Sequence, residues 1–300
     1  MPELPDVVVY VESLASRIVG ERLERLRIAN PFLLRSVTPP IAWAEGRRVV
    51  GIERLGKRIV FAFEQDLFLV LHLMIAGRLR WRDPGAAIPG RVGLAAFDFP
   101  KGTLLLTEAA SRKQASLYAV DGRQGLTEHD RGGIEVLEAS ADEFRRALTR
   151  ENHTVKRALT DPTIFSGIGN AYSDEILHAA GLSPAKLTQR LTDEEIQRLF
   201  TATRSTLLRW IEILRRESRD EFPEKVTAFH DEMAVHGKYG QPCPVCGAPV
   251  QRIVYARNEA NYCARCQTGG KLLSDRSLSR LLREDWPRTL EDLERRRRGG

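Results

Sequence analysis

Residues 243–266 read CPVCGAPVQRIVYARNEANYCARC, and this stretch contains all four cysteines of the 300-residue chain. Cys243 and Cys246 form one Cys-x-x-Cys pair, and Cys263 and Cys266 form a second. Two such pairs at this separation are typical of a single tetrahedral zinc ion. Because four thiolates leave no open coordination position, the sequence predicts one structural Zn²⁺ and not a catalytic one.

The residues between the two cysteine pairs predict a β-hairpin. Residues 249–255 are rich in β-branched and aromatic side chains, and residues 261–262 belong to the expected return strand, with a tip at 257–259. A zinc-bound hairpin can fold without a large core, and it can carry a side chain into a groove. A zinc ribbon that binds protein, or that only fastens the C-terminus, fits the same pattern.

Upstream of the hairpin the pattern is helical. Residues 140–143 (SADE) and 192–195 (TDEE) both match the capping box that opens a helix, and the second helix is expected to run to about Arg216. The polar, glycine-rich segment 121–139 precedes them and predicts a linker between domains.

Between the two capping boxes, residues 167–181 read GIGNAYSDEILHAAG. The glycines predict a tight turn, Asn170 is the expected helix N-cap, and Gly181 is the expected end of the helix. The backbone N–H groups at such a helix N-terminus bind anions well. The stretch therefore predicts a phosphate site, although a plain helix–turn–helix packing unit fits it equally.

The region from about residue 22 to 120 has a β pattern. Glycine, proline and aspartate separate short apolar runs, which predict a sandwich or barrel-like domain. The expected strands are 58–63, 67–73, 92–99 and 103–106. Lys57 stands at the start of one of them, where the plain interpretation is a solvated charge.

The chain begins Met1-Pro2-Glu3. Removal of the methionine would expose the proline nitrogen as a secondary amine, which can attack a sugar carbon and form a Schiff base. Glu3 would then be a neighbouring general acid. Residues 4–19 carry apolar side chains at helical spacing, and we expect a helix there although the run at 7–9 is all valine.

The charge balance of +6 suits a polyanionic partner. We expect no signal peptide and no membrane span, because no apolar run is long enough. The tail 271–300 is charged, with a possible helix around 275–283, and it ends in the arginines 295–298. Such a run is usually a solvated end with weak attraction for nucleic acid.

Together these motifs resemble the formamidopyrimidine-DNA glycosylase / endonuclease VIII family of DNA repair enzymes. The shared features are PELPD at the start, Gly56-Lys57, the segment GIGNAYSDEIL, and the terminal four-cysteine hairpin, in that order. The resemblance covers about residues 1–270. It implies an α+β fold, in which a β-sandwich with an N-terminal helix precedes a helix–two-turn–helix domain and a zinc-finger hairpin.

The implied domains are residues 1–125, 139–237 and 238–270, followed by the charged tail. The implied function is a base-excision-repair DNA glycosylase with AP lyase activity, which removes oxidised or ring-opened bases and then cleaves the strand. The damaged nucleotide is flipped out of double-stranded DNA, the Pro2 amine attacks C1′, and Glu3 shuttles a proton. Lys57 matches the family lysine beside the damaged nucleotide.

The resemblance also implies residues that contact DNA. Asn170 matches the asparagine that binds backbone phosphate, and Lys156 is expected to assist it. Ile75 falls where the family inserts a methionine into the gap left by the flipped base, and Arg112 falls in its arginine–phenylalanine segment, but without the aromatic residue. The family's finger arginine corresponds to Asn258, and Arg257 is one residue earlier.

These departures leave the second elimination step open, and the lesion preference is open because no lesion-covering loop is evident in 215–235. Two other classes remain as alternatives. One is a catalytically inactive binder of damaged or branched DNA on the same scaffold, and the other is a zinc-ribbon protein of RNA or ribosome metabolism. The family implies a monomer in the bacterial cytoplasm.

Overall fold

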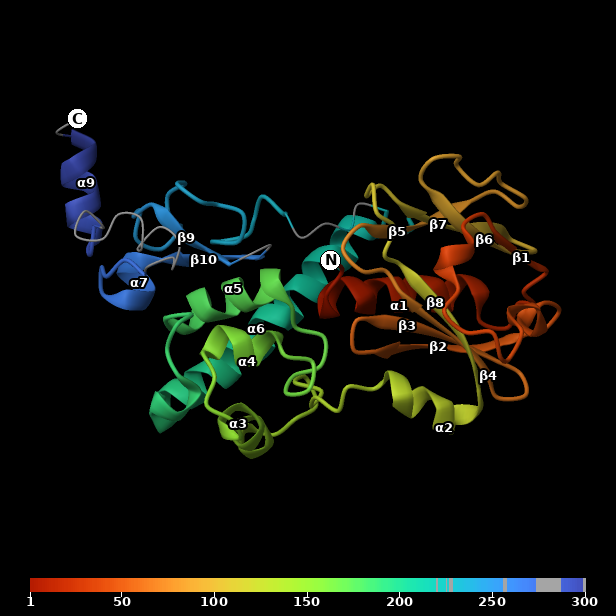
Figure 1. The fold of residues 1–300 in the computed structure, drawn as a ribbon, viewed down its shortest axis with the longest axis horizontal. Helices are drawn as coiled ribbons and strands as arrows, with labels where there is room; N and C mark the ends of the chain where they lie inside the picture. Colours follow the sequence, from red (N-terminus) through yellow and green to blue (C-terminus); the bar gives the residue numbers. More distant parts are fainter. Residues whose placement is uncertain (220, 225, 227–228, 256–257, 274–286, 299–300) are drawn as a thin grey trace. The chain divides into compact units, whose positions relative to one another are not determined.

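The computed structural model describes residues 1–219, 221–224, 226, 229–255, 258–273 and 287–298. Its chain forms two compact units, each of which is described by itself (Figure 1). The first unit comprises residues 1–132 and 208–228, and the second comprises residues 133–207 and 229–300. The boundary between residues 207 and 208 lies inside the longest helix, α6 (Asp193–Ser218).

The first unit contains two four-stranded antiparallel sheets, with strand orders β1-β6-β7-β5 and β2-β3-β4-β8. The strands are β1 (Arg25–Ile28), β2 (Val49–Leu55), β3 (Arg58–Phe63), β4 (Leu67–His72), β5 (Gly77–Arg82), β6 (Gly93–Phe99), β7 (Gly102–Glu108) and β8 (Ser116–Asp121). The expected strands at 58–63, 67–73, 92–99 and 103–106 are therefore confirmed as β3, β4, β6 and β7.

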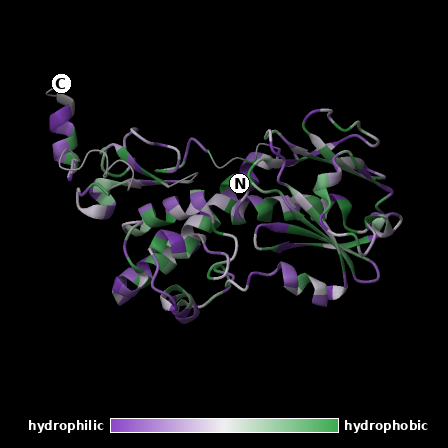
Figure 2. Ribbon diagram, viewed as in Figure 1, coloured by the Kyte–Doolittle hydropathy of each residue, from purple (hydrophilic) through white to green (hydrophobic). Residues whose placement is uncertain are grey.

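The two sheets and helix α1 (Leu4–Ile18) share one apolar core. Phe61 of β3 stacks on Phe97 of β6 with ring centroids 5.5 Å apart, which joins the two sheets. Tyr10 and Leu14 of α1 are fully buried in the same core. Helical spacing therefore prevails over the β propensity of the valine run, because it places one face of α1 in the core. Figure 2 shows hydrophobic (green) residues along strands of this unit, together with hydrophilic (purple) ones.

The expected linker is partly ordered into short helices. After β8 the chain forms α2 (Gly122–Leu126) and a 3-10 turn at Thr127–His129. Leu126 packs against the outer face of the second sheet, beside Phe68 and Val70. This cover explains why β3 and β4 are apolar on both faces.

The second unit begins with the helices α3 (Ala141–Thr149), α4 (Val155–Thr160) and α5 (Asn170–Ala180). Both predicted capping boxes are present: Ser140 pairs with Glu143 before α3, and Thr192 pairs with Glu195 before α6. Helix α6 extends to Ser218, two residues beyond the expected end at Arg216.

The zinc-finger region contains strands β9 (Val250–Tyr255) and β10 (Asn258–Cys263), followed by the short helix α7 (Ala264–Thr268). The predicted hairpin is confirmed, but its tip is shorter than expected because β10 already begins at Asn258, opposite Tyr255. Arg257 lies outside the described residues.

The tail contains helix α9 (Leu290–Arg298), which includes the arginine run that we expected to be a solvated end. Its Leu290 is buried against Val235, Cys243 and Val250. The helix expected around 275–283 lies outside the described residues. No helix in the described part of the chain combines the length and the apolar character needed to cross a membrane.

Candidate active site and metal centre

The N-terminus of the first unit is buried at the start of α1. Pro2 is buried, Glu3 is only 2% exposed, and Asp6 is only 1% exposed. Glu3 is the N-cap of the helix, and its backbone N–H donates a 2.7 Å hydrogen bond to Oδ2 of Asp6. The first turn of α1 therefore fixes the position of the chain terminus.

The amine of Met1 lies in the field of four charged side chains. Burial is the main reason why its pKa is lower than usual. Arg78 and Lys57 lower this pKa further, whereas Glu3 and Asp6 raise it. The structure thus brings the predicted residues Glu3 and Lys57 to the chain terminus, and it favours an unprotonated amine there.

Asp6 is a member of this cluster that the sequence reasoning missed. Burial raises the pKa of its carboxyl group to about 7, against the lowering effect of the hydrogen bond from the Glu3 backbone. Its Oδ1 has no hydrogen-bond partner within the described part of the chain. Such a carboxyl group can hold or release a proton near neutral pH. Its position three residues after Glu3, which is that of a capping box, was the available signal.

The strand register places one further cation, Arg58, and the histidine His72 at the same end of the sandwich. Arg58 of β3 pairs with His72 of β4, which in turn pairs with Ser116 of β8. Lys57 directly precedes this row. Burial, followed by the charges of Arg58 and Lys57, lowers the pKa of His72 to about 4, so that its ring is neutral at pH 7. His72 and Arg78 were not predicted as site residues, because their proximity to Lys57 depends on strand pairing.

The two predicted insertion residues lie on loops that leave this end of the sandwich. Ile75 is 63% exposed between β4 and β5, and it follows Met74, which has a positive φ of 53°. A non-glycine residue in this conformation is strained and is common near functional sites. Arg112 is exposed on the loop between β7 and β8.

The loop that carries Arg112 is organised by a buried acid. Glu108 accepts hydrogen bonds from the backbone N–H groups of Gln114 and Ala115, at distances of 2.9 to 3.1 Å. Nζ of Lys113 donates to the backbone carbonyl groups of Glu108 and Ala110. These contacts keep the loop compact while Arg112 remains exposed.

In the second unit, Asn170 is the first residue of α5, and the N-cap is Gly169. The expected cap is therefore shifted by one residue. The Nδ2 group of Asn170 donates a 2.7 Å hydrogen bond to the backbone carbonyl of Glu259 in β10. This bond joins the start of α5 to the zinc hairpin.

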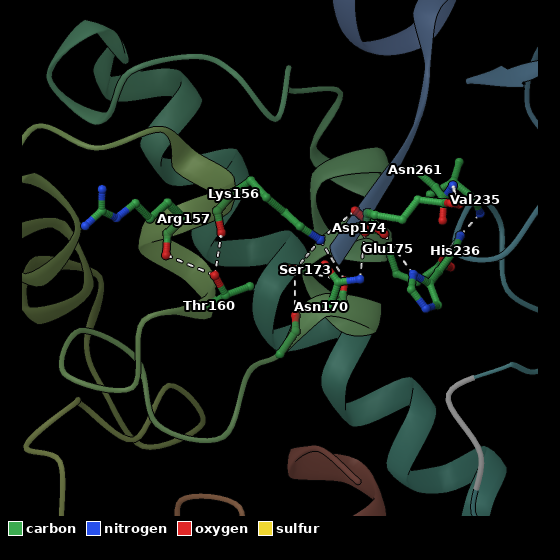
Figure 3. A network of polar contacts seen from close by, with 12 residues as sticks. Lys156, Arg157, Thr160, Asn170, Ser173, Asp174, Glu175, Val235, His236 and Asn261 are labelled. Atoms are coloured by element: carbon green, nitrogen blue, oxygen red, sulfur yellow. Dashed lines mark hydrogen bonds and ion pairs between the residues drawn. The ribbon is translucent and has the colours of Figure 1, made fainter. Parts of the chain in front are cut away.

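Lys156 is buried beneath the start of α5 (Figure 3). Its Nζ donates to the carbonyl of Asn170 at 2.7 Å, to Oγ of Ser173 at 2.8 Å and to Oδ1 of Asp174 at 2.6 Å. An ammonium group has three donors, so these bonds use all of them. The other oxygen of Asp174 contacts Nδ1 of His236 at 2.8 Å.

Glu175 extends this network and was also missed by the sequence reasoning. Its carboxylate accepts backbone hydrogen bonds from Ala234, Val235 and His236, at 2.8 to 2.9 Å. Helix α5 thereby anchors the chain that leads into the zinc finger. The only sequence signal was the adjacent pair of acids on a helix whose other residues are largely apolar.

The four cysteines meet as predicted. Their sulfur atoms all lie within 4.8 Å of one another, with Cys246 and Cys263 at 3.4 Å and Cys243 and Cys266 at 3.9 Å. Tetrahedral zinc with Zn–S bonds of about 2.3 Å requires sulfur atoms about 3.8 Å apart. The donor set therefore fits one structural Zn²⁺.

Known protein domains match the chain in the order expected from its motifs. The matches are the formamidopyrimidine-DNA glycosylase N-terminal domain over residues 1–124, the formamidopyrimidine-DNA glycosylase H2TH domain over 135–221, and the zinc finger found in FPG and IleRS over 240–269. The formamidopyrimidine-DNA glycosylase of Thermus thermophilus is 33% identical over 278 residues, which cover 90% of this chain and 100% of the relative. The chain belongs to the formamidopyrimidine-DNA glycosylase family.

Other members of the formamidopyrimidine-DNA glycosylase family support this membership. The enzyme of Solibacter usitatus is 31% identical, over 89% of this chain and 99% of its own. Among solved structures, the complex of Lactococcus lactis Fpg with DNA containing an abasic site has a TM-score of 0.79 and 26% identity, covering 89% of this chain and 99% of that one. A structure of MutM with DNA containing carbocyclic 8-oxo-G has the same TM-score and 27% identity, covering 89% and 100%.

Proposed function

We propose that this protein is a base-excision-repair DNA glycosylase with AP lyase activity and that the nitrogen of Pro2 is its nucleophile. The observation that carries the proposal is the buried chain terminus, where Glu3, Asp6, Lys57 and Arg78 all act on the terminal amine. An amine with a lowered pKa retains a reactive lone pair at neutral pH. A DNA binder without catalysis would have no need of this arrangement.

The reaction needs the nitrogen of Pro2 to be free. While Met1 is present, the nitrogen of Pro2 is part of a peptide bond. We infer that Met1 is removed before the protein acts. Pro2 is itself buried, so its nitrogen would also be shielded from water once Met1 is removed.

The chemistry then follows from the charges of the cluster. The lone pair of Pro2 attacks C1′ of a flipped nucleotide, and the glycosidic bond breaks with its electron pair on the departing base. Glu3 takes the proton that the Pro2 nitrogen loses and delivers it to O4′ as the sugar ring opens and the Schiff base forms. This step makes the displacement of the base irreversible, so net base release depends on Glu3. Loss of a C2′ proton then expels the 3′ phosphate. The cation of Lys57 lies beside this centre, where it stabilises a phosphate or protonates the base.

The other predicted residues, except Lys156, are proposed to hold the DNA. Ile75 and Arg112 are exposed on loops at the same end of the sandwich as Lys57, which suits insertion into the gap left by a flipped base. Asn170 at the start of α5 suits a backbone phosphate. Arg257 is proposed as a further phosphate contact on sequence grounds alone.

We propose double-stranded DNA with oxidised bases, ring-opened bases or abasic sites as the substrate class. The solved structures of Lactococcus lactis Fpg contain DNA with an abasic site, with Fapy-dG and with an oxidised pyrimidine. The protein is proposed to act as a monomer in the bacterial cytoplasm.

Borohydride trapping tests the proposal directly. Protein with Met1 removed is incubated with duplexes that carry an abasic site, 8-oxoguanine or an oxidised pyrimidine, and is then reduced. The expected result is a covalent protein–DNA adduct that is absent in Pro2→Gly and in protein that retains Met1. DNA binding without an adduct on any duplex would overturn the lyase and favour a non-catalytic binder.

A further inference from the structure

A histidine outside the four-cysteine set touches the metal centre. His178 lies in the last turn of α5, and its Nε2 is 3.2 Å from Sγ of Cys243. The side chain of Cys243 is buried, and His178 is only 9% exposed. The contact is therefore shielded from water, where a single hydrogen bond has a larger effect than at the surface.

The chemistry of the sulfur determines the direction of this hydrogen bond. A zinc-bound cysteine is a thiolate, which has no proton to donate and can only accept. Nε2 of His178 must therefore carry a proton and donate a hydrogen bond to Sγ of Cys243. Such a bond withdraws charge from the sulfur and fixes its orientation, as partners of metal ligands commonly do.

Other hydrogen bonds join both ends of α5 to the zinc-finger region. Asn170 at the start of the helix bonds to Glu259 of β10. Just beyond its end, the carbonyl of Leu182 accepts a 2.8 Å hydrogen bond from Nε2 of Gln267, next to the ligand Cys266. Of these contacts, His178 is the one that reaches a ligand atom itself.

We propose that His178 is an outer-shell partner of the zinc site, and that it couples the stability of the bound metal to helix α5. The proposal concerns the metal centre and does not depend on the lyase chemistry. It gives α5 a second role, because the helix that carries Asn170 would then respond to the presence of bound zinc.

Two variants of the full-length protein test the proposal. His178→Leu removes the donor and keeps an apolar side chain, whereas His178→Gln offers an amide N–H in its place. Ile176→Val is the matched control, because Ile176 is a buried residue of the same helix without a polar atom. All three are loaded with Zn²⁺ or Co²⁺, and circular dichroism checks that they are folded.

The first measurement is the competition of a chromogenic chelator for Zn²⁺. Loss of an outer-shell partner typically weakens metal binding about 10-fold or more. We expect that loss for His178→Leu, at least partial recovery for His178→Gln, and no change for Ile176→Val. An unchanged zinc affinity in folded His178→Leu would overturn the proposal, and so would an equal loss in the control.

The second measurement is the absorption spectrum of the Co²⁺ form. Removal of a hydrogen bond to one thiolate should shift the sulfur-to-cobalt charge-transfer band and leave the tetrahedral d–d bands in place. A changed d–d envelope in His178→Leu would instead show that the histidine is a direct ligand. That result would replace the outer-shell role with a different coordination set.

Discussion

The buried acids of helix α5 in the second unit and of helix α1 in the first unit differ in how completely they are hydrogen-bonded. In the second unit, every oxygen of Asp174 and Glu175 has a hydrogen-bond donor or a cation beside it, and Lys156 uses all three of its donors. In the first unit, Asp6 is equally buried, yet its Oδ1 has no partner within the described residues. A satisfied network holds a scaffold in place, whereas an unsatisfied acid beside a terminal amine is suited to chemistry.

The largest effect is expected when the carboxylate of Glu3, next to the proposed nucleophile Pro2, is removed. Glu3→Gln should lower base release by about 10²–10⁴-fold, the range of general acid–base catalysis. DNA binding should be retained, because the substitution keeps the shape of the side chain. Single-turnover base release and a gel-shift assay measure the two effects.

Glu24→Gln is the control for Glu3→Gln, because Glu24 is an exposed glutamate of the same unit. It should have normal activity. Near-normal base release in Glu3→Gln would remove Glu3 from the mechanism.

Lys156→Met tests the satisfied network in the other unit. It leaves Asp174 buried without its main cation, which typically costs about 3–5 kcal/mol of stability. Urea unfolding of the zinc-loaded protein, followed by circular dichroism, measures the loss. Lys101→Met is the control, since the Lys101 side chain is 71% exposed and its ion pair with Glu21 should contribute less than about 1 kcal/mol.

Lys156→Met also distinguishes a structural role of Lys156 from direct binding of phosphate. A lysine that binds phosphate reduces the slope of log affinity against log salt concentration by about 1 when it is removed. We expect the slope to be unchanged, because the Lys156 ammonium group is committed to Asn170, Ser173 and Asp174. A reduced slope together with normal stability would support direct phosphate binding.

Asp6→Asn should change how the folding stability of the protein depends on pH. The pKa of Asp6 is raised from 3.8 to about 7 in the folded state, so the folded protein binds more protons than the unfolded chain between these values. Stability from this group is therefore present at low pH and is lost as pH rises through about 4 to 7, by up to about 4 kcal/mol. The substitution should remove this slope.

Melting temperatures at pH 5 and pH 8 test the effect of Asp6→Asn. The difference between the two pH values should shrink in this variant and should remain as in the unmodified protein in Asp142→Asn, whose side chain is exposed. An unaltered pH dependence in Asp6→Asn would show that the carboxyl group is ionised in the folded protein across this range.

The smallest expected effect is that of Asn170→Ala. Loss of one phosphate contact and of the bond to Glu259 should weaken binding about 10-fold. The loss should be equal for every lesion and for undamaged duplex, because phosphate contacts carry no sequence information. Fluorescence anisotropy with several duplexes measures it, and a loss confined to one lesion would contradict the phosphate role.

The features that could be predicted from sequence depend on local chemistry. The cysteine spacing predicted the metal site, the capping boxes predicted the starts of α3 and α6, and apolar spacing predicted α1. Strands β1, β2, β5 and β8 were missed. In β5, for example, the charged residues Arg78 and Arg80 interrupt the apolar run. The place of each of these strands in its sheet depends on pairing with a neighbouring strand, which a single stretch of sequence does not reveal.

The site residues that were missed depend on burial. Lys156 was predicted as a residue that assists Asn170, but its burial was not predicted, because lysine is seldom buried. Asp6 and Glu175 have ordinary positions in amphipathic helices. Only the folded chain shows that Oδ1 of Asp6 lacks a partner among the described residues, whereas the carboxylate of Glu175 has three. In the sequence, His178 likewise looks like an ordinary helix residue. Only the fold shows that Cys243, 65 positions later, lies against it.

The packing of Leu290 has a consequence for biosynthesis. The small core around Cys243 and Val250 includes this leucine, which follows all four cysteines in the sequence. The ribosome adds residues in order, so the metal ligands are made before the residue that packs against them. The zinc-binding element can therefore reach its complete packing only after Leu290 has been made, and a chain terminated between Cys266 and Leu290 would keep the ligands but lack this part of their core.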